Sequence, residues 1–204
     1  MTKTKIHTLE ALLGPNLLFK VSKHQEKPNL RNFTAKYVED FDHGPKVNTM
    51  EALSGKDFVL LYFSGAWCRP CQDFSPKLKQ FYKASRNSAN EEQVGGVMIE
   101  VVYVSSDRDQ SEFNQYYGTM PWLALESQHY KTLVSRKCKV RGIPTLVVLD
   151  GMGNFITDTA VDDVTQAHDQ VERMAQVFAM WKAKEPVPLE EATFSKSGNA
   201  CIVM

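Results

Sequence analysis

The chain has 204 residues, of which 43% are hydrophobic and 24% are charged. Its 24 lysines and arginines balance its 24 aspartates and glutamates, so the formal net charge is zero and no nucleic-acid partner is expected. No apolar run approaches the length of a membrane span, and the composition therefore predicts one globular core with appendages.

Residues 1–46 are predicted to form an N-terminal extension. Glu10 and the pair Gly14-Pro15 interrupt its early apolar stretch, so a secretory signal is not expected. Residues 17–19 predict a short strand. Residues 22–46 are polar and rich in turn residues, which indicates an inserted loop within this extension.

Residues 47–162 are predicted to form the main domain. Thr49 is expected to cap a short helical turn. Residues 58–63 form an apolar run of strand length, rich in branched and aromatic side chains. In residues 72–83 the apolar side chains recur at helical spacing, and Pro76 is expected to kink that helix.

Strands and helices continue to alternate after this helix. They are predicted as a strand over 97–104, helices over 107–117 and 127–137, and strands over 143–149 and 155–159. Such alternation requires crossover connections and therefore a mixed sheet. Residues 163–185 predict one amphipathic C-terminal helix, and residues 186–204 predict a flexible tail after Pro186 and Pro188.

The most informative motif is Cys68-Arg-Pro-Cys71, which lies between a predicted strand and a predicted helix. Residues three apart share a helix face, so the two sulfurs can reach bonding distance. Unpaired amides and the dipole at a helix N-terminus favour the reactive thiolate. A disulfide that closes so small a loop restrains the unfolded chain little. The motif therefore predicts a redox-active dithiol.

Two other interpretations of the cysteine pair are less favoured. A zinc site needs a second ligand pair, but Cys138 and Cys201 stand alone and the five histidines show no ligand spacing. A purely structural disulfide fits poorly with four cysteines in a chain that is expected to lack a secretory signal. We expect neither a metal nor an organic cofactor.

Several segments resemble the thioredoxin superfamily, namely Tyr62-Phe-Ser-Gly-Ala-Trp-Cys-Arg-Pro-Cys71 with Pro76, and Gly142-Ile-Pro-Thr145. Four more resemble its tryparedoxin and nucleoredoxin branch: Val104-Ser-Ser-Asp-Arg-Asp109, Tyr116-Tyr117, Met120-Pro-Trp-Leu-Ala-Leu125 and Leu149-Asp-Gly-Met-Gly-Asn154. The resemblance covers roughly residues 47–160. It implies an α/β thioredoxin fold, in which helices flank a central mixed sheet.

The resemblance also implies roles for individual residues. Cys68 would be the attacking thiolate and Cys71 the resolving thiol, joined as a redox disulfide in the oxidised state. Substrate contacts would come from Trp67, Arg69, Pro70, Ile143 and Pro144. In this superfamily the bond before the proline is cis, and the preceding residue pairs its backbone with a substrate strand. The alternative is an ordinary trans proline that opens a strand.

The chain departs from the thioredoxin pattern at two positions. Tyr62 stands where thioredoxins carry a buried carboxylate, so proton removal from Cys71 must use water or another group. Arg69 stands where proline or glycine is more usual. Its fixed charge should favour the Cys68 thiolate, unless solvent screens it.

The two remaining cysteines receive separate interpretations. Cys138 is expected to be a buried, inert thiol, with a regulatory thiol as the alternative. Cys201 begins Cys-Ile-Val-Met, which fits the C-a-a-X prenylation pattern and favours a farnesyl group. The alternative is a coincidental cysteine in a frayed tail.

The resemblance implies a thiol-disulfide oxidoreductase that reduces disulfides in client proteins such as peroxiredoxins. Electrons would come from trypanothione, from glutathione or from a reductase protein. The alternative function is a redox-sensitive adaptor that binds a client with little turnover. The expected location is the cytoplasm, with a prenyl group at Cys201 as a tether to the cytosolic face of a membrane.

Overall fold

The computed structural model describes residues 8–20, 45–87, 92, 94–126, 128–195 and 201–202. Most of the predicted insertion, residues 22–44, lies outside these ranges. Across the described residues, a seven-stranded sheet has the order β2-β1-β5-β4-β3-β7-β8. A separate two-stranded ladder joins β6 and β9.

The sheet is mixed, as the sequence predicts. Its strands are β1 (Asn16–Leu18), β2 (Lys46–Asn48), β3 (Phe58–Ser64), β4 (Ile99–Ser105), β5 (Leu123–Leu125), β7 (Thr145–Asp150) and β8 (Phe155–Thr157). β3, β4 and β5 are parallel, whereas β7 runs antiparallel to β3. The parallel strands therefore end at the same edge of the sheet, where the dithiol segment begins.

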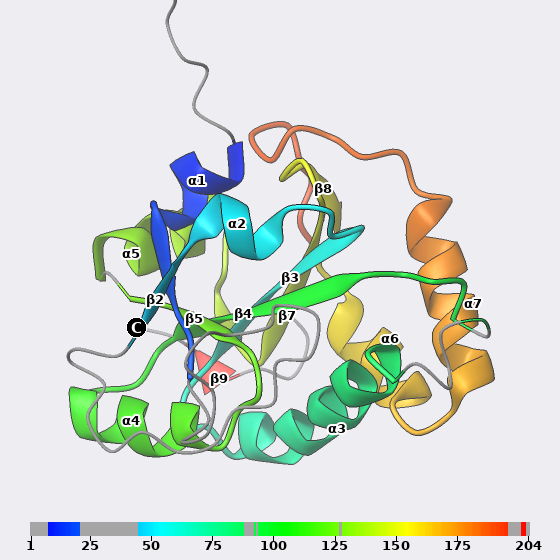
Figure 1. Ribbon diagram of the computed structural model, residues 1–204. Helices are drawn as coiled ribbons and strands as arrows, with labels where there is room; N and C mark the ends of the chain where they lie inside the picture. The colour runs from blue at the N-terminus through cyan, green and yellow to red at the C-terminus, as the bar shows by residue number, and fades with distance from the viewer. Residues whose placement is uncertain are drawn as a thin grey trace, which may run out of the picture.

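Helices cover both faces of the sheet (Figure 1). They are α1 (Thr8–Leu13), α2 (Thr49–Leu53), α3 (Arg69–Ser85), α4 (Gln110–Gly118), α5 (Gln128–Lys137), α6 (Ala160–Ala167) and α7 (Val171–Lys182). Figure 1 shows α3, α6 and α7 grouped on one side, with α1 and α5 on the other. Contacts between these helices follow the same grouping.

Alternate side chains of β3 enter two different hydrophobic cores. Leu60 and Tyr62 join the core beneath α3, α6 and α7. Leu61 and Phe63 join the core beneath α1 and α5. All seven residues of β3 are buried, because side chains alternate across a strand and helices cover both faces. β3 is therefore an interior strand of the sheet, between β4 and β7.

Several element boundaries differ from the sequence prediction. The predicted strand over 143–149 is two strands, β6 (Gly142–Ile143) and β7, separated by Pro144. β8 ends at Thr157 rather than at residue 159. The cap of α2 is Asn48 rather than Thr49, because the Asn48 Oδ1 accepts from the amides of Met50 and Glu51. The Thr49 hydroxyl donates to the Gly14 carbonyl instead.

α4 begins later than predicted, at Gln110 rather than at residue 107. The side chain of Asp109 caps it by accepting from the Glu112 amide at 2.8 Å. Asp107 stays outside the helix because its carboxylate binds the loop before the dithiol. The short elements α1, β2, β5 and β9 were not predicted, since two to six residues give little periodicity.

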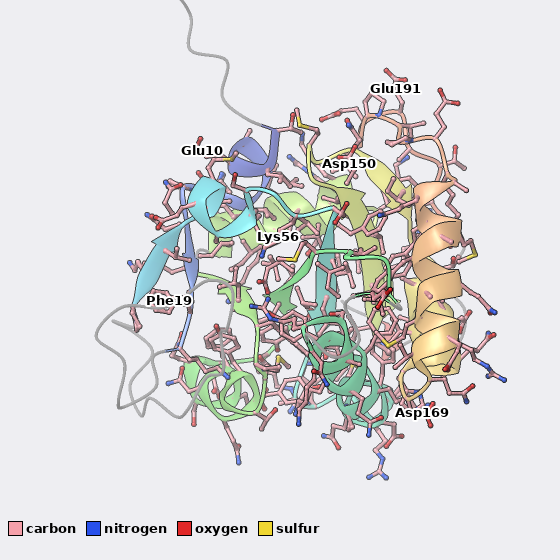
Figure 2. All side chains as sticks on the ribbon, turned by 45° about the vertical axis from the view of Figure 1, so that its right-hand side comes forward. Glu10, Phe19, Lys56, Asp150, Asp169 and Glu191 are labelled. Carbon is pink, nitrogen blue, oxygen red and sulfur yellow. A yellow bond between two sulfur atoms is a disulfide. The ribbon has the colours of Figure 1, made fainter. Side chains whose placement is uncertain are left out.

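The predicted single C-terminal helix is two helices, α6 and α7. Gln170 has the extended values φ −128° and ψ 107°, and its amide donates to the Ala167 carbonyl at 3.1 Å, which closes a turn. Asp169, labelled in Figure 2, lies in this turn at one end of α7. Splitting the helix lets α6 pack on α3 while α7 places the Trp181 ring against Phe58.

The predicted flexible tail is packed against the domain as far as Ser195. Val187 exchanges two backbone hydrogen bonds with Phe155, at 2.8 and 3.1 Å. Leu189 and Ala192 are buried. The Ser195 amide donates to Asp158 at 2.7 Å. The apolar side chains between the prolines and Ser195 bury themselves at the β8 edge, which a linker would not do.

Lys20 follows β1 and is buried, which is unusual for lysine. Its ammonium donates to the carbonyls of Tyr117 and Met120 and lies 4.4 Å from the centre of the Tyr117 ring. Burial, with a smaller effect from Lys79, lowers the pKa of Lys20 to about 7.

This pKa predicts how stability changes with pH. The ordinary pKa of lysine is 10.5, so above pH ~7 the unfolded chain holds a proton that the folded protein releases. The free energy of unfolding should therefore rise with pH between these two values. Relative to Lys20→Met, the wild type should gain about 1 kcal/mol or more between pH ~7 and ~9.

Urea unfolding of both proteins at the two pH values measures this difference. Lys83→Met, which changes an exposed lysine on α3, is the matched control and should run parallel to the wild type. A constant difference between wild type and Lys20→Met would contradict the lowered pKa.

Candidate active site

The dithiol lies where β3 passes into α3. Cys68 is the N-cap of α3, with φ −91° and ψ 108°, and it is joined to Cys71 by a disulfide with the Cα atoms 5.2 Å apart. The Cys71 amide lies 3.3 Å from the Cys68 sulfur and donates to it. This amide and the helix dipole would stabilise a negative charge on Cys68 after reduction. Pro70 occupies the first turn, where its missing donor costs no helical bond.

The structure brings the Ile143-Pro144 segment beside the dithiol. The Cys68 sulfur lies 3.5 Å from the Ile143 carbonyl oxygen. The Ile143-Pro144 peptide bond is cis, as the sequence resemblance predicted. Both cysteines and Ile143 are fully buried in the core beneath α1 and α5. The amino end of α3 and the carboxyl end of β6 therefore meet at the Cys68 sulfur.

Arg69 is poorly placed to stabilise a Cys68 thiolate, although its positive charge suggested that role. Its side chain is 82% exposed, and its Nε lies 3.5 Å from the Asp73 carboxylate, one helical turn further on. Solvent and Asp73 both screen the guanidinium. The interpretation in which Arg69 is screened fits this arrangement, and the helix N-terminus is the better-placed source of thiolate stabilisation.

The loop before the dithiol is held by the loop after β4. The Trp67 indole donates to the Ser106 carbonyl at 2.8 Å, and the Ala66 amide donates to Asp107 at 2.6 Å. A Cβ at Gly65 would come within 2.9 Å of the Trp67 indole nitrogen. The same Cβ would lie 3.3 Å from the Ser106 carbonyl, so a larger residue at position 65 would displace the Trp67 ring or the loop after β4.

Asp107 is a positioning residue that the sequence prediction missed. Its second carboxylate oxygen accepts from the Tyr103 hydroxyl at 2.5 Å and from the Ser105 hydroxyl at 2.7 Å. The available signal was its place directly after a buried strand next to the dithiol strand, at the sheet edge where α/β proteins gather their sites. The sequence prediction placed Asp107 inside a helix, where a bond to the neighbouring loop was not expected.

Tyr62 lies under the first turns of α3 in a group of hydroxyls. Its hydroxyl is 2.8 Å from the Ser75 hydroxyl, which is 2.7 Å from that of Tyr116. Burial raises the pKa of Tyr62 well above its usual value, so the phenol stays neutral. Tyr62 therefore cannot replace the thioredoxin carboxylate as a proton acceptor near neutral pH.

Cys138 and Cys201 occupy different surroundings. Cys138 is a buried free thiol, and burial raises its pKa to about 12, so it stays protonated and unreactive, as predicted. Cys201 belongs to β9 (Cys201–Ile202), whose backbone pairs antiparallel with β6, with Cys201 opposite Ile143. Its position in a ladder beside the dithiol was not predicted.

Two further features concern the part of the chain that the structure describes. There, no group of three or more histidine, cysteine, aspartate or glutamate side chains is placed to hold a metal ion. None of the helices described there is long and apolar enough to cross a membrane.

Known proteins resemble this chain in sequence and fold. Residues 55–155 match a family model described as thioredoxin-like. Tryparedoxin from Trypanosoma brucei brucei is 37% identical over 125 residues, which are 60% of this chain and 76% of that protein. Probable nucleoredoxin 1 from Arabidopsis thaliana is 42% identical over 107 residues, which are 51% of this chain. The match spans only 17% of that nucleoredoxin's own length.

Solved structures agree with these relatives. Tryparedoxin II from C. fasciculata has a TM-score of 0.58 at 30% identity, covering 78% of this chain and 88% of its own. Tryparedoxin II complexed with glutathionylspermidine has a TM-score of 0.52 at 35% identity, covering 60% and 81%. The chain belongs to the thioredoxin-like family of thiol-disulfide oxidoreductases, and within it to the tryparedoxin and nucleoredoxin branch.

The contacts of Asp107 predict a specific defect in Asp107→Ala. Three donors lose their acceptor, so the free energy of unfolding should fall by about 1–3 kcal/mol. The Ala66-Trp67 loop should lose its position, and the reduced protein should react more slowly with a small aromatic disulfide. Urea unfolding and stopped-flow absorbance measure the two effects.

Asp109→Ala is the matched control. It removes the cap of α4, which should cost about 1 kcal/mol, but it leaves the bonds to Ala66 and Trp67 in place. The reaction rate of Asp109→Ala should therefore stay near that of the wild type. Equal slowing in both variants would mean that Asp107 acts only through general stability.

Proposed function

We propose that the protein reduces disulfides in client proteins through Cys68 and Cys71. The observation that carries this proposal is the disulfide at the start of α3, with the Cys68 sulfur 3.5 Å from the Ile143 carbonyl. A bond that closes so short a loop adds little stability, whereas its place at a helix N-terminus suits exchange.

The reaction begins with the reduced protein. The Cys68 thiolate attacks one sulfur of the client disulfide, forming a mixed disulfide and releasing the other client sulfur as a thiolate. Cys71 then attacks the Cys68 sulfur, which forms the Cys68–Cys71 disulfide and releases the second client thiolate. The two client thiolates take up protons, one of them the proton that Cys71 loses. The client gains two electrons and the dithiol loses two.

The client binds along the backbone of Ile143 as an added strand. Trp67, Arg69 and Pro70 are exposed or half-buried around Cys68 and form the rim of this surface. A client strand would thus be held while its sulfur approaches Cys68. Peroxiredoxins are the client class that we propose, because their disulfides must be reduced after each turnover.

A low-molecular-weight thiol donor regenerates the dithiol. The structure of a tryparedoxin II complexed with glutathionylspermidine supports a donor of the trypanothione or glutathione type. The donor thiolate attacks the Cys68–Cys71 disulfide, and a second donor thiol completes the reduction, so that the donor leaves as a disulfide.

Substitution of each cysteine separates the steps. Cys68→Ser should lower the rate of insulin disulfide reduction by more than ~10³-fold, because the nucleophile is lost. Cys71→Ser should stop at the mixed disulfide and retain the client covalently. Cys138→Ser is the matched control and should keep normal turnover, since that thiol is buried and protonated.

Insulin reduction is followed by turbidity with trypanothione, glutathione or a thioredoxin reductase as the donor. Normal turnover by Cys68→Ser would refute the proposal. A wild type that binds a client but turns over with none of the three donors would favour the redox-sensitive adaptor instead.

We propose a second feature for the C-terminus, farnesylation of Cys201. The support is the pattern Cys-Ile-Val-Met at the end of the chain. A single prenyl chain gives only marginal membrane binding, so the protein should divide between the cytosol and the cytosolic face of a membrane. The packed segment before Ser195 would then hold the domain close to the lipid attachment site.

Cell fractionation of wild type and Cys201→Ser, with mass spectrometry of the C-terminal peptide, tests this feature. The wild type should carry the farnesyl group and appear in both fractions. Cys201→Ser should be confined to the soluble fraction. An unmodified terminus that ends in Met204 would contradict lipidation.

A further inference from the structure

β9 pairs with the backbone of Ile143, along which we propose that a client strand binds. We call this backbone of β6 the client edge. β9 pairs antiparallel with β6, with Cys201 opposite Ile143 and Ile202 opposite Gly142. Ile143 is also the residue whose carbonyl oxygen lies 3.5 Å from the Cys68 sulfur. Figure 1 shows β9 in red near the end of the sheet where α3 begins. The chain's own end therefore occupies the place proposed for a client strand.

The nucleophile is enclosed in this arrangement. Cys68 and Cys71 are both 0% exposed, although exchange with a client requires access to the Cys68 sulfur. Ile143 is equally buried. A conformation with β9 on this edge is therefore closed to clients, and β9 must leave before a client strand can pair with Ile143.

The segment before β9 is anchored close by. The Ser195 amide and hydroxyl both donate to Asp158, at 2.7 and 2.8 Å. The Phe194 ring lies 4.8 Å from that of Phe155, and Lys139 donates to the Ala192 carbonyl at 3.2 Å. Lys139 lies in the turn before β6. Its hydrogen bond therefore holds the tail close to β6, the strand that pairs with β9.

A short connection joins the anchor to the strand. Only residues 196–200 separate Ser195 from Cys201, and a chain of this length spans at most about 20 Å. A tether of this length gives an effective concentration in the millimolar range. Even a weak strand pairing at this edge would therefore compete with clients at micromolar concentration.

We propose that the C-terminal strand is an intramolecular substrate of the dithiol, in which Cys201 acts as a third redox cysteine. This inference rests on the proposed function of Cys68 and Cys71. The Cys201 thiolate attacks the Cys68 sulfur of the oxidised site, so the Cys68–Cys201 bond forms and the Cys68–Cys71 bond breaks. Cys71 leaves as a thiolate and takes up the proton that Cys201 lost. The exchange is redox-neutral, and it locks the strand over the client edge until a donor thiol reduces it.

The exchange concerns the unmodified C-terminus. A prenylated Cys201 is a thioether, which has no thiol to exchange. A prenylated chain therefore cannot form the Cys68–Cys201 disulfide. In such a chain no covalent bond would hold β9 over the client edge. Cys138 does not compete for Cys68 because it is buried and stays protonated.

A cross-link experiment on the full-length Cys71→Ser chain tests the inference. The protein is made in bacteria, which add no prenyl group, and is treated with glutathione disulfide under denaturant-free conditions. Without Cys71, glutathione bound to Cys68 can be displaced only by another cysteine of the chain. We expect a Cys68–Cys201 peptide in a non-reducing digest, with a yield that does not depend on protein concentration.

Cys71→Ser combined with Cys201→Ser is the matched control, and it should retain glutathione on Cys68. Retention of glutathione on Cys68 with a free Cys201 in the single variant would overturn the inference. A cross-link that grows with protein concentration would also overturn it, since that link joins two molecules.

Client kinetics provide a second readout. A chain that ends at Ser195 keeps the anchor but lacks the strand, so its KM for insulin should fall about threefold or more while kcat stays near that of the wild type. An unchanged KM would count against a closed client edge. Normal insulin reduction without the cross-link would refute this inference alone, whereas the cross-link without insulin reduction would refute the proposed function alone.

Discussion

The contact between the Cys71 amide and the Cys68 sulfur is the interaction on which the site depends. It exists because β3 is buried on both faces and ends directly before α3, so the first unpaired amides of the helix face the last residue of the loop. The same helix start supplies the dipole that favours a thiolate. A charge on Arg69 adds little, because that side chain is exposed and paired with Asp73. The helix backbone, rather than the Arg69 side chain, is therefore the group placed to stabilise a Cys68 thiolate.

Two loops from neighbouring strands complete the site. Asp107 holds the backbone before Trp67, and Ile143 places a carbonyl against the sulfur. Asp107 follows the end of β4, and Ile143 lies just before the start of β7. Both β4 and β7 are neighbours of β3, so the sheet order brings the two residues together although they are far apart in sequence. The third contribution is β9, which pairs with β6 and returns the C-terminus to the dithiol. A single edge of the sheet thus holds the proposed nucleophile, the proposed client surface and the strand that we propose as its competitor.

The sequence predicted the parts of this arrangement that depend on local pattern. The apolar run before Cys68 and the helical spacing after it placed the dithiol correctly, and the resemblance predicted the cis bond before Pro144. The role of Asp107 depends on a contact with Ala66 across two strands, which no local pattern reveals. The packed tail was missed for a related reason. Its prolines indicate a linker locally, but Val187 finds a partner in the distant β8 edge.

Reactivity of the Cys68–Cys71 disulfide is the property that distinguishes a redox site from a structural bridge. Equilibrating the wild type with thiol-disulfide buffers of graded potential, followed by alkylation and mass spectrometry, measures its reduction potential directly. We expect one two-electron transition between Cys68 and Cys71 with a midpoint above about −300 mV, while Cys138 stays a thiol throughout. A pair that remains oxidised in buffers well below about −300 mV would behave as a structural disulfide and would contradict the proposed chemistry.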